Sequence, residues 1–134
     1  MKSKAPLALM EQIIMVLVFA VAATACVRVF VYSSQLSRRA AVKDAAIVEA
    51  QNTAETLKCC GGSFEEALRM LERSRDENGG IVKETEGPDG TALFVHVQKM
   101  DSGLPLLGMA EIVVSEEDGS CLYRLETAWQ EESA

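Results

Sequence analysis

Few side chains in this 134-residue chain could perform chemistry. There is one histidine, His96, and there are four cysteines, Cys26, Cys59, Cys60 and Cys121. A catalytic base needs a positioned partner, and no nucleophile stands beside His96 in the sequence. The cysteines include no C-x-x-C pair, so they predict neither a zinc site nor a thioredoxin-type redox centre. Phosphate-binding and dinucleotide-binding glycine motifs do not occur either. We therefore expect a protein that is not an enzyme and that uses no cofactor and no metal.

Two interpretations of the cysteines stay open. Cys59 or Cys60 could form a disulfide with Cys121 if this part of the chain lies in an oxidising compartment. Alternatively the thiols stay free, because free cysteine packs well as a small apolar side chain. Cys59 and Cys60 fall at the predicted C-terminal end of a helix, where the dipole disfavours a thiolate. We therefore expect them to be structural.

Acidic residues dominate the second half of the chain. After residue 60 there are six Lys or Arg against sixteen Asp or Glu, a net charge of -10. Such a surface repels the phosphate backbone, so nucleic acid is not an expected partner. The acids at 84–89 and 116–118 lack the spacing of a calcium-binding loop and indicate solvated turns. No small-molecule substrate is expected.

The elements that position these residues begin with an apolar segment. No charged residue occurs between Gln12 and Val27, and the wider run from Ala5 has the length of a membrane-spanning helix, about 20 residues. A basic leader, residues 1–6, precedes it. Tyr32 falls where an interfacial aromatic is expected, and Arg28 could extend its charge to the interface. We therefore predict a transmembrane helix over residues 7–32.

Glu11 is the unusual residue of this segment. A carboxylate costs about 2.5–3.5 kcal/mol at the centre of a membrane helix, and less near an end. The stretch Leu7–Val18, with this acid behind a basic leader, resembles the N-terminal segment of type IV pilins and type II secretion pseudopilins. In that family the glutamate is the fifth mature residue and pairs with the N-terminal amine of a neighbouring subunit.

The resemblance makes Leu7 the first mature residue and puts Pro6 where the family has its processing glycine. Because of this departure we expect the leader to remain uncleaved. The partner of Glu11 would then be Lys4, or the Met1 amine, of an adjacent, staggered chain. An alternative is that Glu11 merely lies at the interface of an ordinary anchor, where the helix dipole favours an acid.

Residues Ala23–Cys26 loosely match a bacterial lipobox, with Cys26 as the lipidated residue. Against this alternative, Ala23 replaces the usual leucine and Glu11 interrupts the apolar region. The segment after Cys26 is also apolar and does not form a polar tether.

The remainder predicts a helical stem and a small head. No helix breaker occurs between Leu7 and Gly61, so the helix should continue as a soluble stem over 33–60. One face of the stem is apolar at helical spacing, formed by Val42, Ala46, Ala50, Ala54 and Leu57. The opposite face, which includes Glu49, is expected to be solvated. Ser63–Glu66 is a capping box for a short helix to about Arg73, followed by a break at 78–80.

Alternating strands are expected from Ile81 onward, with turns at 87–90 and 117–119. The predicted fold class is therefore α+β: a long N-terminal helix, half transmembrane and half soluble, packed on three to four antiparallel strands, with one short extra helix. The acidic head would span 61–134.

These features together predict a non-catalytic, pilin-like minor or accessory subunit of a type IV pilus or type II secretion-like assembly. The expected partners are other pilin-like subunits or an assembly platform, contacted through the membrane helix, and membrane lipid. The charge bias alone does not orient the chain. The resemblance implies a single-pass protein of the cell membrane, with a cytoplasmic N-terminus and an extracytoplasmic head. The alternative is a stand-alone anchored binding module, single-pass or lipidated at Cys26.

Overall fold

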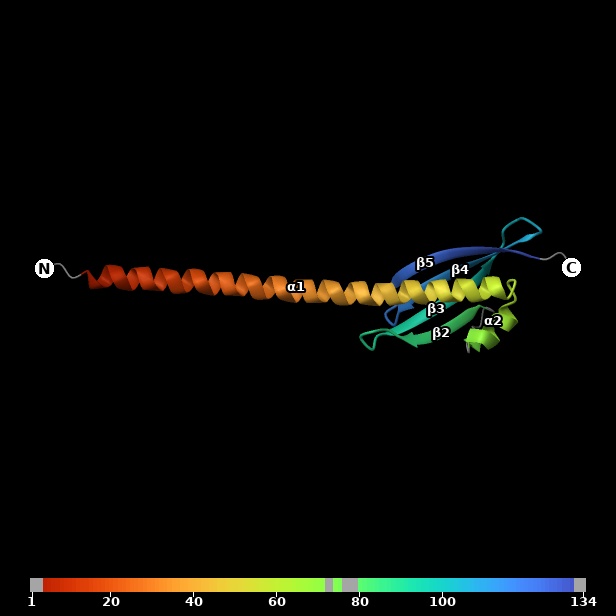
Figure 1. Ribbon diagram of the computed structural model, residues 1–134, viewed down its shortest axis with the longest axis horizontal. Coiled ribbons are helices and arrows are strands. Elements are labelled where there is room, and N and C mark those ends of the chain that lie inside the picture. Colours follow the sequence, from red (N-terminus) through yellow and green to blue (C-terminus); the bar gives the residue numbers. More distant parts are fainter. Residues whose placement is uncertain (1–3, 72–73, 76–79, 132–134) are drawn as a thin grey trace. The chain divides into compact units, whose positions relative to one another are not determined.

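The computed structural model describes residues 4–71, 74–75 and 80–131 (Figure 1). The first helix, α1, spans Ala5–Cys59, and the second, α2, spans Phe64–Leu71. The strands are β1 Ser74–Arg75, β2 Ile81–Glu86, β3 Ala92–Met100, β4 Leu107–Glu116 and β5 Cys121–Gln130. The prediction of an α+β fold with a long N-terminal helix, an antiparallel sheet and one short extra helix is confirmed. The predicted end of the short helix, at Arg73, lies outside the described residues.

The strands form a meander in the order β1-β2-β3-β4-β5, and every neighbouring pair is antiparallel. Four strands are long, and β1 contributes only two residues. The turn after β2 closes with hydrogen bonds from the Gly90 N–H to the Gly87 carbonyl (3.0 Å) and from the Gly87 N–H to the Thr91 carbonyl (2.8 Å). The turn after β4 closes with a bond from the Gly119 N–H to the Glu116 carbonyl (2.9 Å). Both turns lie where the sequence predicts them.

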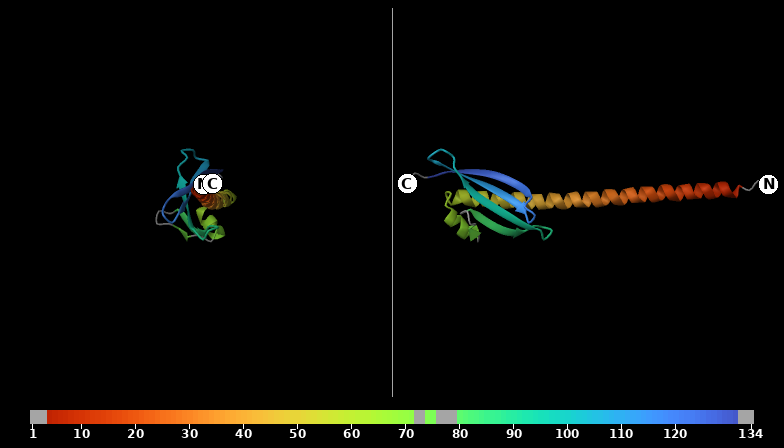
Figure 2. Two further views of the ribbon diagram at one scale, coloured as in Figure 1. Left: turned by 90° about the vertical axis from the view of Figure 1, so that its left-hand side faces the viewer. Right: turned by 180° about the vertical axis from the view of Figure 1, so that it is seen from behind.

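One face of the sheet is covered by the C-terminal part of α1 (Figures 1 and 2). The predicted apolar stripe of α1 is buried, and Thr53 is buried with it. The sheet contributes the alternate residues of its strands, including Leu93, Val95 and Val97 of β3 and Ala110, Ile112 and Val114 of β4. This alternation is why one face of each strand is apolar and the other is polar. The sequence therefore identified both sides of this core.

The end of α1 is a Schellman motif. The Gly62 N–H donates to the Leu57 carbonyl (2.9 Å) and the Gly61 N–H donates to the Lys58 carbonyl (3.1 Å). Both glycines have positive φ, 57° and 80°, which a residue without a Cβ adopts at little cost. Ser63 then caps α2 by accepting a bond from the Glu66 N–H at its hydroxyl (3.5 Å). The chain thus reverses within four residues.

The single tryptophan closes the core beside this corner. Trp129 is 6% exposed, and a Cβ at Gly62 or at Gly108 would lie only 1.9 or 2.3 Å from its indole nitrogen. The indole N–H and the Thr127 hydroxyl, on the same side of β5, have no hydrogen-bond partner among the described residues. The two glycines therefore make the space that the indole ring occupies.

The chain divides into two compact units, Met1–Arg38 and Arg39–Ala134. Residues 39–59 of α1 belong to the same unit as the sheet. The sequence-based division instead starts the stem at residue 33 and the head at residue 61. The difference has a packing cause: the stem residues from Val42 onward are buried against the strands and form one core with them.

Candidate functional site

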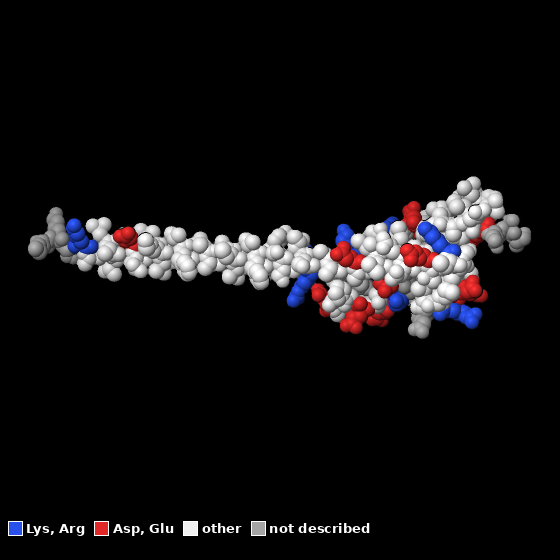
Figure 3. Space-filling model, in the orientation of Figure 1, with Lys and Arg blue, Asp and Glu red and all other residues white. Residues whose placement is uncertain are grey.

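The apolar segment of α1 is the first candidate for a functional surface. Its large apolar side chains are between 47% exposed (Val31) and 76% exposed (Phe19). The most apolar window has a mean hydropathy of 2.5, and none of it is buried. Among the described residues, α1 is the one helix long and apolar enough to cross a membrane. This apolar window of α1 is therefore uncovered, unlike a core helix, which is mostly buried. A membrane span or a signal sequence would account for it. On the face drawn in Figure 3, most of this stretch carries no charged side chain.

Thr24 is a polar residue inside this segment whose hydroxyl is bonded within the helix. The Thr24 hydroxyl donates to the Ala20 carbonyl one turn earlier (2.8 Å). The backbone N–H and C=O groups are bonded within the helix. A spanning segment must satisfy its hydrogen bonds internally, because the bilayer core offers no water. Thr24 therefore adds no unsatisfied group to the segment.

Lys4 and Glu11 lie at the start of α1. The helix begins at Ala5, and the Lys4 carbonyl accepts the first bond, from the Ala8 N–H (3.3 Å). Seven residues make nearly two turns, so the two side chains share a face about 10 Å apart along the axis. Both are exposed, and neither forms an ion pair within the described residues. The geometry leaves the carboxylate free for another molecule.

Pro6 and Leu7 occupy the first turn of α1. Proline is well tolerated there because its missing N–H would have no partner in the helix. The peptide bond between Pro6 and Leu7, the candidate cleavage site, therefore lies within regular helix. Cys26 is also inside α1 and is exposed.

The structure does not bring Cys121 close to Cys59 or Cys60. All four cysteines are free. Cys60 lies two residues before Gly62, which contacts Trp129 near the end of β5. Cys121 begins the same strand, eight residues away, which is about 27 Å at ~3.4 Å per residue. A disulfide needs Cα atoms within about 7 Å. Cys121 and the Cys59–Cys60 pair therefore lie near opposite ends of β5, which fits the second interpretation, free thiols.

Cys60 is half-buried, and its Sγ lies 3.7 Å from Sδ of Met70 on α2. Burial, then the Glu66 carboxylate and Cys59, raise the pKa of the Cys60 thiol. The thiolate fraction at neutral pH is therefore reduced, and only the thiolate reacts readily. This fits the structural role expected for this cysteine.

We predict that iodoacetamide alkylates Cys60 several-fold more slowly than free cysteine at pH 8. The rate should keep rising at pH values where free cysteine has already reached its plateau. Tandem mass spectrometry of the peptide that contains Cys59 and Cys60 would measure each site. An alkylation rate at Cys60 equal to that of free cysteine would contradict the raised pKa.

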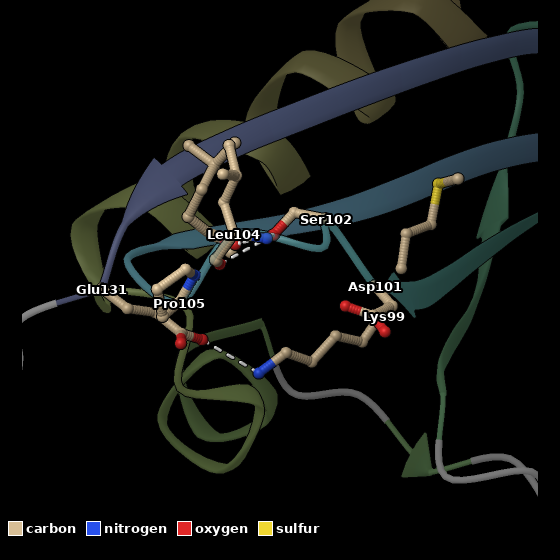
Figure 4. Close-up of a pocket in the computed structure, with 9 residues that line it drawn as sticks. Lys99, Asp101, Ser102, Leu104, Pro105 and Glu131 are labelled. Atoms are coloured by element: carbon tan, nitrogen blue, oxygen red, sulfur yellow. Dashed lines mark hydrogen bonds and ion pairs between the residues drawn. The ribbon is translucent and has the colours of Figure 1, made fainter.

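The loop between β3 and β4 borders a groove of about 510 Å³ (Figure 4). Its polar groups satisfy one another: Lys99 Nζ pairs with Glu131 Oε1 at 3.0 Å, and the Asp101 carboxylate accepts the Gly103 N–H at 3.0 Å. Exposed Leu104 and Pro105 add apolar surface. Nothing in this lining pairs a nucleophile with a base.

The remaining candidates for chemistry are also dispersed. His96 is exposed on the sheet face opposite α1, between Val82 and Val113 in register. In the turn after β4, the Ser120 N–H donates to Asp118 (2.8 Å). Hydrogen bonding with the side chain and the backbone of Ser120 lowers the pKa of Asp118. No group of three or more His, Cys, Asp or Glu side chains that could hold a metal ion occurs in the part of the chain that the structure describes.

The fold and the exposed segment define a class of protein: an N-terminal apolar helix able to anchor in a membrane, attached to a small β-sheet head. A long helix packed on a four-strand antiparallel sheet is a pilin-like architecture. Comparisons with protein-family models, characterised proteins and solved structures found no match.

Proposed function

We propose that this chain is a non-catalytic, pilin-like minor or accessory subunit of a type IV pilus or type II secretion-like assembly. Its N-terminal helix would span the cell membrane, with the N-terminus in the cytoplasm and the head outside. Other pilin-like subunits, or an assembly platform, would contact that helix, and lipid would surround the rest of it. The head would bind neither nucleic acid nor a small-molecule substrate.

The observation that supports this proposal best is the Glu11 carboxylate. It lies on an exposed apolar helix and has no ion pair within the described chain. A charge at that position is costly unless a neighbour compensates it. Lys4 lies about 10 Å earlier on the same face, so a parallel neighbour displaced by two helical turns would bring its lysine to this carboxylate. Such a displacement would set the axial spacing between subunits.

The test is Glu11→Ala in the full chain, expressed in the membrane of a host that carries a pilus or secretion machine of this kind. Polar contacts between membrane helices are worth about 0.6–1.7 kcal/mol, so we expect co-purification of partner subunits to fall roughly threefold to fifteenfold. The amount of chain in the membrane fraction should not change. Gln12→Ala, which removes the adjacent uncharged polar side chain, is the matched control.

Equal partner recovery from wild type and Glu11→Ala would count against an assembly role. It would favour the second candidate, a stand-alone anchored binding module. One observation supports that candidate: the loop between β3 and β4 leaves Leu104 and Leu106 62% and 50% exposed beside the groove. An anchor of this kind should tolerate the loss of Glu11.

A further inference from the structure

The outer edge of β5 is an open strand edge. This strand is last in the sheet order, and nine of its ten residues have a partner in β4 on one side, Leu122 being skipped at a bulge (Figures 1 and 2). On the other side, the described residues provide no strand. The backbone N–H and C=O groups along such an edge can pair with another extended chain. Because β5 is long, its outer edge offers a row of backbone groups along which another extended chain could pair.

The side chains that flank this edge toward α1 are incompletely covered. Thr127 and Trp129, near the end of β5, are buried at 4% and 6% exposure. Tyr123 and Leu125 project to the same side and contact the core, yet both are only half-buried. One more strand beside β5 would cover their remaining apolar surface.

The opposite side of β5 carries an unbalanced charge. Glu126 lies directly opposite Glu111 of β4, and like charges in this position repel. Arg124 Nη1 pairs with Glu111 Oε1 at 3.1 Å. Glu126 is exposed and has no ion pair within the described chain. Glu126 is the last residue of a row that crosses the sheet through Gln98 and Glu111. A cation on the next strand would therefore neutralise the carboxylate at this edge.

We propose that the β5 edge takes up an extended segment of a partner protein that carries Lys or Arg opposite Glu126 and apolar side chains opposite Tyr123 and Leu125. Backbone hydrogen bonds would supply the affinity, and the alternating side chains would supply the specificity. The proposal concerns the head alone and holds whether or not Glu11 acts in assembly.

A second copy of β5 is the competing occupant. Antiparallel pairing centred on Leu125 would set Arg124 of each copy opposite Glu126 of the other. Arg124 already pairs with Glu111 at 3.1 Å, so in that arrangement it would divide its charge between two carboxylates. The charges therefore favour a different partner.

The experiment uses the full chain in phosphatidylcholine nanodiscs, whose lipid has no net charge. The probes are two fluorescein-labelled peptides of alternating Thr and Val, identical except for a central Lys or Glu. Cross-strand charge pairs are worth up to about 1 kcal/mol, so by fluorescence anisotropy the Lys peptide should bind roughly fivefold more tightly. Hydrogen exchange should slow at residues 121–130. Glu126→Lys should reverse the preference between the peptides. Glu84→Lys, which makes the same charge change at an exposed site on β2, should preserve it.

Equal binding of the two peptides would overturn the proposal, as would protection confined to other strands. If Glu84→Lys also reversed the preference between the peptides, the peptides would be responding to the net charge of the head. That result would overturn the proposal as well. Protection of residues 121–130 in the peptide-free chain, rising with its concentration, would assign the edge to a second copy instead.

Discussion

A fragment of residues 39–134 should fold and unfold cooperatively in water, whereas residues 61–134 alone should lack a stable tertiary structure. The longer fragment is the compact unit that contains both the sheet and the helical residues packed on it. The shorter one keeps every strand but loses the helix residues that cover the sheet, Val42, Ala46, Ala50, Thr53, Ala54 and Leu57. The effect should be loss of the fold.

The physical reason is the size of the exposed surface. Without the helix, the sheet presents Ile81, Leu93, Val95, Val97, Ile112 and Val114 to water, all of which are at most 1% exposed in the intact unit. Burying one such side chain is worth about 1.5–3 kcal/mol. The free energy lost when several such side chains are no longer buried is comparable with the whole stability of a small domain, about 5–15 kcal/mol. A head of this size has little to compensate for that loss.

Circular dichroism melting and the dispersion of amide resonances would measure the difference. The longer fragment should show a sigmoidal transition and dispersed signals, and the shorter one should show neither. Removal of residues 1–38 also removes the exposed apolar segment, so the longer fragment serves as the internal control. A cooperative transition in residues 61–134 would show that the sheet is stable without α1.

Gly62→Ala should be the most damaging single substitution at the corner between α1 and α2. An added Cβ would lie 1.9 Å from Trp129 Nε1, so either the indole or the corner must move. Overpacking of this kind costs about 1–3 kcal/mol, in addition to about 1–2 kcal/mol for a left-handed residue other than glycine. Chemical denaturation should measure the loss, and the fluorescence of the single tryptophan should change because its packing changes.

Gly61→Ala is the matched control, since Gly61 also has positive φ but a Cβ there meets no atom within 4 Å. It should lose only the backbone contribution and leave the tryptophan fluorescence unchanged. Gly108→Ala tests the same indole from β4, where a Cβ would lie 2.3 Å from Nε1. Equal losses at Gly61 and Gly62 would mean that Trp129 relaxes freely at this site.

The sequence by itself determined the elements of this protein. The uncharged run after Glu11 predicted the exposed helix, and the spacing from Val42 to Leu57 predicted the buried face of the stem. Alternation in β3 predicted which side chains face the core. These signals are local, because the period of a helix or a strand repeats within the element itself. The helix begins at Ala5, two residues before the predicted start at Leu7, so Pro6 lies inside it.

Only the tertiary structure decided which side chains of different elements contact one another. Glu49, expected on the solvated face of the stem, pairs with Lys83 of β2 at 3.6 Å. Thr53 is buried although it is polar, because its hydroxyl donates to the Glu49 carbonyl within the helix at 2.7 Å. Trp129 fits against Gly62 and Gly108, and Cys121 is kept far from Cys60. The open edge of β5 likewise follows from the strand order. Such neighbours are set by strand register and packing between distant segments, which the periodicity of a single segment does not specify.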